Sequence, residues 1–125
     1  MLFDLSAALD AHPKVGASWE GFVLEELIGL AGERNAYYWR TQAGAELDVL
    51  LMLRGRRIGV EVKYADAPSM TRSMHASIAS LKLDWLYVVY PGGEPYTLRP
   101  GVEVLPLPLA RGRIIAARDK RTRPN

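Results

Sequence analysis

Two carboxylates and one amine stand on neighbouring apolar segments of the chain. Asp48 lies near the start of one apolar run, and Glu61 and Lys63 end a second run that follows a basic turn at 54–56. If the two runs are arms of a β-hairpin, the side-chain period of two puts Glu61 and Lys63 on one face. Depending on the turn, Asp48 lies opposite Glu61 or opposite Lys63. Either register brings two carboxylates and one ammonium together, which predicts a site for a hard divalent cation.

These residue types suit phosphodiester chemistry. Mg²⁺ and similar ions prefer oxygen ligands and are typically held by one or two carboxylates together with phosphate oxygens, as Asp48 and Glu61 could provide. The Lys63 ammonium could orient the attacking water or stabilise charge building at phosphorus. Amphipathic strands also carry Glu and Lys two apart on a solvated face, so the spacing alone has low specificity. Here both faces of the strands are apolar enough to be covered, and charges on a covered face need a partner, a metal or a role.

Helices and strands are predicted to alternate along the chain. Apolar spacing and turn residues predict helices over 2–9, 16–31 and 71–82, strands over 36–40, 45–53, 57–63 and 85–90, and one or two edge strands near 102–109. The apolar residues expected on the inner side of the 16–31 helix include Phe22. The strand at 85–90 is expected to run parallel to the strand of Glu61 after a right-handed crossover. We therefore expect an α/β domain with the order αβββαβ.

Several stretches carry a resemblance to a known family. Residues 37–50, 61–64 and 88–92 resemble the C-terminal domain of unknown function that follows the ATPase module in a prokaryotic family of AAA+-type ATPases, and 16–27 resembles its first core helix. That domain is similar to the PD-(D/E)XK, or restriction-endonuclease-like, fold. The resemblance implies a mixed central sheet flanked by helices, and it implies that Glu20 approaches the metal site. No G-x-x-x-x-G-K-[ST] phosphate loop occurs, so this chain is not itself the ATPase.

Composition favours one globular domain. The chain has 125 residues, of which 49% are hydrophobic and 24% charged, with no Cys and a net charge of +2. No apolar run is long enough to cross a membrane and no secretory leader is recognised, so we expect a cytoplasmic protein without membrane contact. Residues 1–110 are expected to form the nuclease-like domain. Residues 111–125, with six basic residues and one acid up to position 123, are expected to form a flexible basic tail.

Other polar residues are assigned more loosely. Glu46 shares a face with Asp48 and is a further candidate ligand or hydrogen-bond acceptor. His12 and His75 are expected to be surface or capping residues, and the aromatic run 37–39 is expected to pack rather than to stack bases. The candidate nucleic-acid contacts are basic residues, whose alternative role is to keep an exposed turn soluble: Arg54, Arg56, Arg57, Arg40 and Arg72.

The leading hypothesis from the sequence is a Mg²⁺- or Mn²⁺-dependent nuclease that hydrolyses phosphodiester bonds, with DNA as the expected substrate. Asp48, Glu61 and Glu20 would hold the metal, with Glu46 as a further candidate, and Lys63 would act on the attacking water. The rival hypothesis is a catalytically inactive member that serves as a protein-docking or DNA-binding module for an ATPase. A third interpretation, a fragment of a larger protein, predicts an exposed apolar patch. Homodimerisation is left open.

Overall fold

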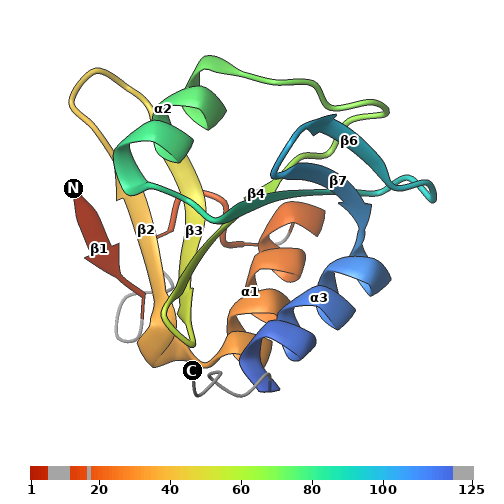
Figure 1. Ribbon diagram of the computed structural model, residues 1–125, viewed down its shortest axis with the longest axis horizontal. Coiled ribbons are helices and arrows are strands. Elements are labelled where there is room, and N and C mark those ends of the chain that lie inside the picture. Colours follow the sequence, from red (N-terminus) through yellow and green to blue (C-terminus); the bar gives the residue numbers. More distant parts are fainter. Residues whose placement is uncertain (6–11, 17, 120–125) are drawn as a thin grey trace.

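The computed structural model describes residues 1–5, 12–16 and 18–119, and within them the chain forms a mixed α/β domain (Figure 1). The α/β class predicted from the sequence is confirmed. The elements in chain order are β1 (Leu2–Asp4), α1 (Trp19–Ala31), a short 3₁₀ turn η2 (Glu33–Asn35), β2 (Ala36–Arg40), β3 (Glu46–Leu53), β4 (Arg56–Val62), α2 (Arg72–Leu81), β5 (Trp85–Tyr90), β6 (Tyr96–Arg99), β7 (Val102–Pro106) and α3 (Leu107–Asp119).

The strands form one sheet with the order β1-β2-β3-β4-β5-β7-β6 in the described part of the chain. Strands β1 to β4 pair antiparallel with one another, whereas β5 pairs parallel with β4 and β7 pairs parallel with β5. The predicted hairpin of β3 and β4 and the parallel return through α2 are therefore confirmed. Strand β6 adds an antiparallel edge beyond β7.

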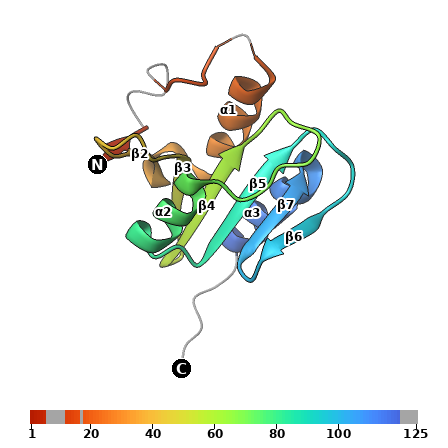
Figure 2. The same cartoon turned by 90° about the horizontal axis from the view of Figure 1, so that it is seen from above.

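Helices cover both faces of the sheet. Figure 2 shows α1 and α3 on one side and α2 on the other. The core under α1 and α3 includes Val49, Val60 and Ile114, and the core under α2 includes Leu50 and Leu86. Because both faces are buried, β3 and β4 read as nearly continuous apolar runs, and a charged side chain on either strand needs a polar partner.

Helix α1 begins and ends at recognisable caps. The Ser18 hydroxyl accepts a hydrogen bond from the Gly21 N–H at 3.1 Å, and Gly32, with φ of 95°, ends the helix. The buried face is formed by Val23, Leu27 and their neighbours in the same stripe. Phe22, which the spacing placed on the inner side, is 56% exposed instead, because that stripe already fills the contact with the sheet.

The start of the chain differs from the prediction. Residues 2–4 form the edge strand β1, paired antiparallel with β2, rather than the first turn of a helix. The terminal ammonium of Met1 also donates to the Arg40 carbonyl at 2.6 Å. Residues 2–4 form a strand because the edge of β2 offers hydrogen-bond partners to their backbone. Three residues are too few to show this pairing in the sequence. Residues 6–9 of the predicted helix lie outside the described residues.

The end of the chain differs as well. Residues 111–119 belong to α3, whose Ala110 and Ile114 are fully buried against the core, so the predicted domain boundary at residue 110 falls inside a packed helix. Arg111 pairs with Glu26 of α1, and the Arg118 guanidinium donates to the Leu30 carbonyl at 3.0 Å. Apolar residues four apart anchor this segment despite its charge. The remainder of the predicted tail, 120–125, lies outside the described residues. Among the helices described, none is long and apolar enough to span a membrane.

Candidate metal centre

The β3–β4 hairpin sets the register of the two carboxylates. Arg54 and Gly55 both have positive φ, of 55° and 77°, as a two-residue type I′ turn requires. Leu53 then faces Arg56, and the pairing continues to Val49 and Val60. Carried one residue further, this register places Asp48 opposite Glu61, which is one of the two arrangements predicted.

At this end of the hairpin, side chains replace the backbone ladder. The Asp48 N–H donates to Glu61 Oε1 at 3.1 Å, and the Val62 N–H donates to Asp48 Oδ2 at 2.8 Å. Both carboxylates are nearly buried, with 4% of Asp48 and 5% of Glu61 exposed. The backbone therefore holds each carboxylate in a fixed position between the two strands.

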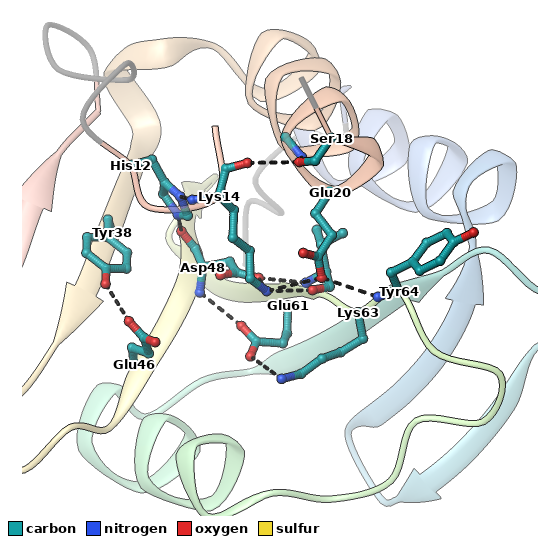
Figure 3. A network of polar contacts seen from close by, with 12 residues as sticks. His12, Lys14, Ser18, Glu20, Tyr38, Glu46, Asp48, Glu61, Lys63 and Tyr64 are labelled. Carbon is teal, nitrogen blue, oxygen red and sulfur yellow. Dashed lines mark hydrogen bonds and ion pairs between the residues drawn. The ribbon is translucent and has the colours of Figure 1, made fainter. Parts of the chain in front are cut away.

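A lysine that the sequence analysis did not single out completes this arrangement. The Lys14 Nζ donates to Asp48 Oδ2 at 2.7 Å and to the Val62 carbonyl at 2.6 Å, and it lies 3.8 Å from Glu20 Oε2 (Figure 3). An ammonium thus sits among oxygen atoms from β3, β4 and α1. The only sequence signal for it is its place just before the helix that carries Glu20.

His12 fixes the segment that carries Lys14. Its Nδ1 accepts the Lys14 N–H at 3.0 Å, and its Nε2 lies 2.9 Å from the Asp48 carbonyl oxygen. Because Nδ1 acts as an acceptor, the ring proton lies on Nε2, which donates a hydrogen bond to the backbone carbonyl of Asp48. His12 is also buried against the ring of Tyr38, with ring centroids 4.7 Å apart. The expectation of a surface or capping histidine is wrong for His12.

Helix α1 supports the same segment by close backbone contact. A Cβ on Gly21 would come within 2.6 Å of the Lys14 carbonyl oxygen and within 2.8 Å of the Gly16 nitrogen. Only glycine allows the backbone of residues 14–16 to approach the helix this closely. Helix α1 therefore positions two parts of the site, Glu20 by its first turn and Lys14 by this contact.

Glu20 and Lys63 lie at the rim of the site, as Figure 3 shows. Glu20 Oε2 accepts the Tyr64 N–H at 3.3 Å, and Lys63 Nζ lies 3.6 Å from Glu61 Oε2. The Lys63 side chain is 36% exposed, in contrast to the buried carboxylate it faces. The structure thus brings Asp48, Glu61, Lys63 and Glu20 to one end of the β3–β4 hairpin.

The buried charges shift one another's titration. Burial, followed by the negative charge of Asp48, raises the pKa of Glu61 to about 8, although Lys14 and Lys63 oppose the shift. For Lys14, burial favours the neutral amine, but the carboxylates of Asp48, Glu61 and Glu20 outweigh it and raise its pKa. Lys14 therefore remains an ammonium at neutral pH.

Glu46 is engaged elsewhere. Its Oε2 accepts a hydrogen bond from the Tyr38 hydroxyl at 2.5 Å, on the neighbouring strand β2. Burial, followed by this hydrogen bond, raises the pKa of Tyr38 to about 12.

Within residues 1–5, 12–16 and 18–119, no three side chains of His, Asp or Glu gather closely enough to hold a metal by themselves. A metal here would need the Val62 carbonyl or water as well as the carboxylates.

The basic residues predicted to bind nucleic acid fall into two groups. Arg54, Arg56 and Arg57 lie at the hairpin turn, at the opposite end of β3 and β4 from the carboxylates. Two of these guanidinium groups hold the fold together: Arg54 donates to the Arg118 carbonyl at 2.7 Å, and Arg57 donates to the Leu81 carbonyl at 2.9 Å.

The other two arginines lie at the same end of the sheet as the site. Arg40 faces Glu46 across β2 and β3. Arg72 begins α2 and lines a hollow of about 370 Å³ together with residues 43–45.

An aromatic hollow adjoins Glu20. Trp19 and Tyr64, with ring centroids 5.7 Å apart, line a hollow of about 380 Å³ together with Ser18 and Glu20. Tyr64 is 71% exposed. The run 37–39, by contrast, contributes Tyr38 and Trp39 to the core, as predicted.

Comparison with known proteins places the chain in a family. Residues 15–110 match the model of a family described as "Domain of unknown function (DUF4143)", and the chain belongs to that family. It is similar to two proteins named only as uncharacterized, Rv2008c of Mycobacterium tuberculosis and Mb2031c of Mycobacterium bovis. Each is 48% identical over 99 residues, which is 79% of this chain and 22% of the relative. The chain thus spans about a fifth of these curated relatives. No solved structure matches it.

Proposed function

We propose that this domain is a divalent-metal-dependent nuclease that hydrolyses phosphodiester bonds, with DNA as its substrate. The observation that carries the proposal is the position of the Lys14 ammonium, which marks a place where Asp48 Oδ2 and the Val62 carbonyl converge on one positive charge beside Glu20. Carboxylate and carbonyl oxygens are also the ligands of Mg²⁺ and Mn²⁺. The resemblance to PD-(D/E)XK nucleases supports the same conclusion.

The residues of the site have separate roles in this proposal. Asp48, Glu61 and the Val62 carbonyl would hold Mg²⁺ or Mn²⁺, and Glu20 would complete the shell through water. When bound, the ion supplies Lewis-acid activation of water and positive charge beside the phosphate. Lys63, partly exposed next to Glu61, has the freedom to turn its ammonium toward the attacking water or the phosphate oxygens.

Features around the site support a nucleic acid as substrate. Arg40 and Arg72 lie at the same end of the sheet, where their guanidinium groups could contact phosphates of a bound strand. The hollow between Trp19 and Tyr64 offers an aromatic surface beside Glu20 on which a base can stack. Because Arg54 and Arg57 bind backbone carbonyls at the far end, the proposed contact surface relies on Arg40 and Arg72 rather than on the hairpin turn.

A second function is a docking or DNA-binding module, without catalysis, that works with an ATPase module. Two observations favour it: Lys14 and Lys63 already approach the carboxylates as counter-ions, and the chain matches only 22% of the length of its curated relatives. Exposed apolar side chains at the edge strand β1, from Met1 to Phe3, support a contact with further protein.

Plasmid cleavage separates the two functions. In Mn²⁺ or Mg²⁺ the native chain should nick supercoiled DNA, and EDTA should stop it. Lys63→Met should lower the rate by about 10² to 10³, similar to the loss of one preorganised electrostatic donor. Its DNA affinity should stay close to that of the native chain, because the arginines provide the phosphate contacts.

Asp48→Asn is the matched control because it keeps the size of the side chain while removing a proposed ligand charge, and it should abolish cleavage. Equal nicking by the native chain and by Lys63→Met would show that the activity comes from another site or a contaminant. Absence of any metal-dependent cleavage by the native chain would favour the docking module.

A further inference from the structure

The Lys14 ammonium lies where oxygens of Asp48, Val62 and Glu20 converge. Its nitrogen lies 2.7 Å from Asp48 Oδ2 and 2.6 Å from the Val62 carbonyl oxygen, with Glu20 Oε2 at 3.8 Å. Divalent cations are bound by the same oxygen types at about 2.0 to 2.6 Å. A small inward movement of these oxygens would therefore suit a metal ion at the place where the ammonium now lies.

An ammonium and a divalent cation cannot share this place. Two positive charges a few ångströms apart repel strongly in a buried site, and the two groups would need the same oxygen lone pairs. Lys14 could turn away once an ion has taken its place beside Asp48, since its side chain is 24% exposed and it is the Lys14 backbone that His12 and Gly21 hold. The flexible stem would then carry the amine toward solvent.

We propose that Lys14 is a built-in occupant of the cation position, so that a divalent ion enters only by displacing its ammonium. This rests on the proposed function in so far as the ion is the nuclease's metal. In the absence of metal, Lys14 holds Asp48 and Val62 in the arrangement that the ion needs. Lys14 thereby keeps the oxygens of the site in place without metal, and it weakens metal binding because its ammonium must first be displaced.

Titration with Mn²⁺ tests the competition. By isothermal titration calorimetry, Lys14→Met should bind Mn²⁺ about 10-fold or more tightly than the native chain, because no charge-assisted hydrogen bonds have to be broken first. Lys14→Arg, which keeps a cation at this position, should bind no more tightly than the native chain. Asp48→Asn in the Lys14→Met background should remove the binding.

Lys63→Met is the matched control. It removes the same charge from the same site, but Lys63 approaches only the outer oxygen of Glu61, at 3.6 Å. A general gain from lowering the positive charge would appear equally in both variants. Displacement from the shared position predicts a gain in Lys14→Met much larger than that in Lys63→Met.

A measurement on the native chain avoids any loss of folding in Lys14→Met, whose Asp48 loses a buried partner. Acetylation by an N-hydroxysuccinimide ester, followed by mass spectrometry of peptides, reports the exposure of each amine. Saturating Mg²⁺ should raise the acetylation rate of Lys14 several-fold over that in EDTA, while the rate at the exposed Lys82 stays constant.

The outcomes distinguish this inference from the proposed function. Tight Mn²⁺ binding by Lys14→Met with none by the native chain supports the occupant role but contradicts a metal-dependent native enzyme. Equal binding by both, with unchanged Lys14 acetylation, overturns the inference and leaves the nuclease proposal standing. If neither chain binds Mn²⁺, both proposals fail.

Discussion

Asp48 is the residue on which the site depends. Its Oδ2 accepts hydrogen bonds from the Val62 N–H and from Lys14 Nζ, its N–H donates to Glu61, and its carbonyl accepts from His12. Each partner comes from a different part of the chain or from the facing strand. A carboxylate with this many donors is held in one position, which is what a metal ligand or a structural ion pair requires.

Glu61 should make stability depend on pH. Its pKa of about 8 in the folded chain lies above the ordinary value of 4.5, so the folded state binds this proton more tightly. The stabilisation is complete below about pH 4.5 and is lost as the pH rises through 8. In EDTA, the free energy of unfolding should therefore fall across this window, by up to a few kcal/mol.

Denaturant titrations of the native chain and of Glu61→Gln at several pH values measure this contribution as a difference. The amide cannot ionise, so the variant should lack this part of the pH dependence. Identical pH profiles for the two chains would show that Glu61 titrates normally and that its burial does not favour the protonated form.

The sequence could predict only part of this constellation. The sequence identified Asp48, Glu61 and Lys63 as neighbours because a hairpin with a short turn of known geometry relates their positions. Lys14 and His12 contact Asp48 across 34 and 36 residues, in a segment without periodicity, so no local pattern links them. Such contacts are set by the packing of α1 against the sheet.

Among the elements, those with a clear hydrophobic period were predicted and those without one were not. The strands β2 to β5 and the helices α1 and α2 follow the predicted ranges closely. The part of α3 from residue 111 onwards was predicted to be a flexible tail, because its arginines mask the apolar spacing of Ala110 and Ile114. Strand β1 is too short to show a period. These two elements depend on partners distant in sequence.

Helix α1 offers a test of the contact that positions Lys14. Gly21→Ala should destabilise the chain by roughly 1 to 3 kcal/mol, because its methyl group would overlap the Lys14 and Gly16 backbone. Gly29→Ala on the same helix is the control: it has open space around it and should stabilise by about 0.5 to 1 kcal/mol. Urea denaturation measures both, and a stabilising Gly21→Ala would show that the segment 12–16 does not pack as described.

At the scale of the whole molecule, the site lies where distant parts of the chain meet at one end of the sheet. Segment 12–16, helix α1 and the ends of β3 and β4 each contribute one or more of its polar groups. Because residues 15–110 match the family model, most of this assembly belongs to the family domain, while Lys14 and His12 precede the matched range.

The central claim is that this end of the sheet is a divalent cation site, and anomalous diffraction from crystals grown with Mn²⁺ tests it most directly. The account predicts one strong anomalous peak between the carboxylates of Asp48 and Glu61 and the Val62 carbonyl, with the Lys14 side chain turned away. Crystals at saturating Mn²⁺ that show no peak there, with Lys14 still bonded to Asp48 and Val62, would contradict it.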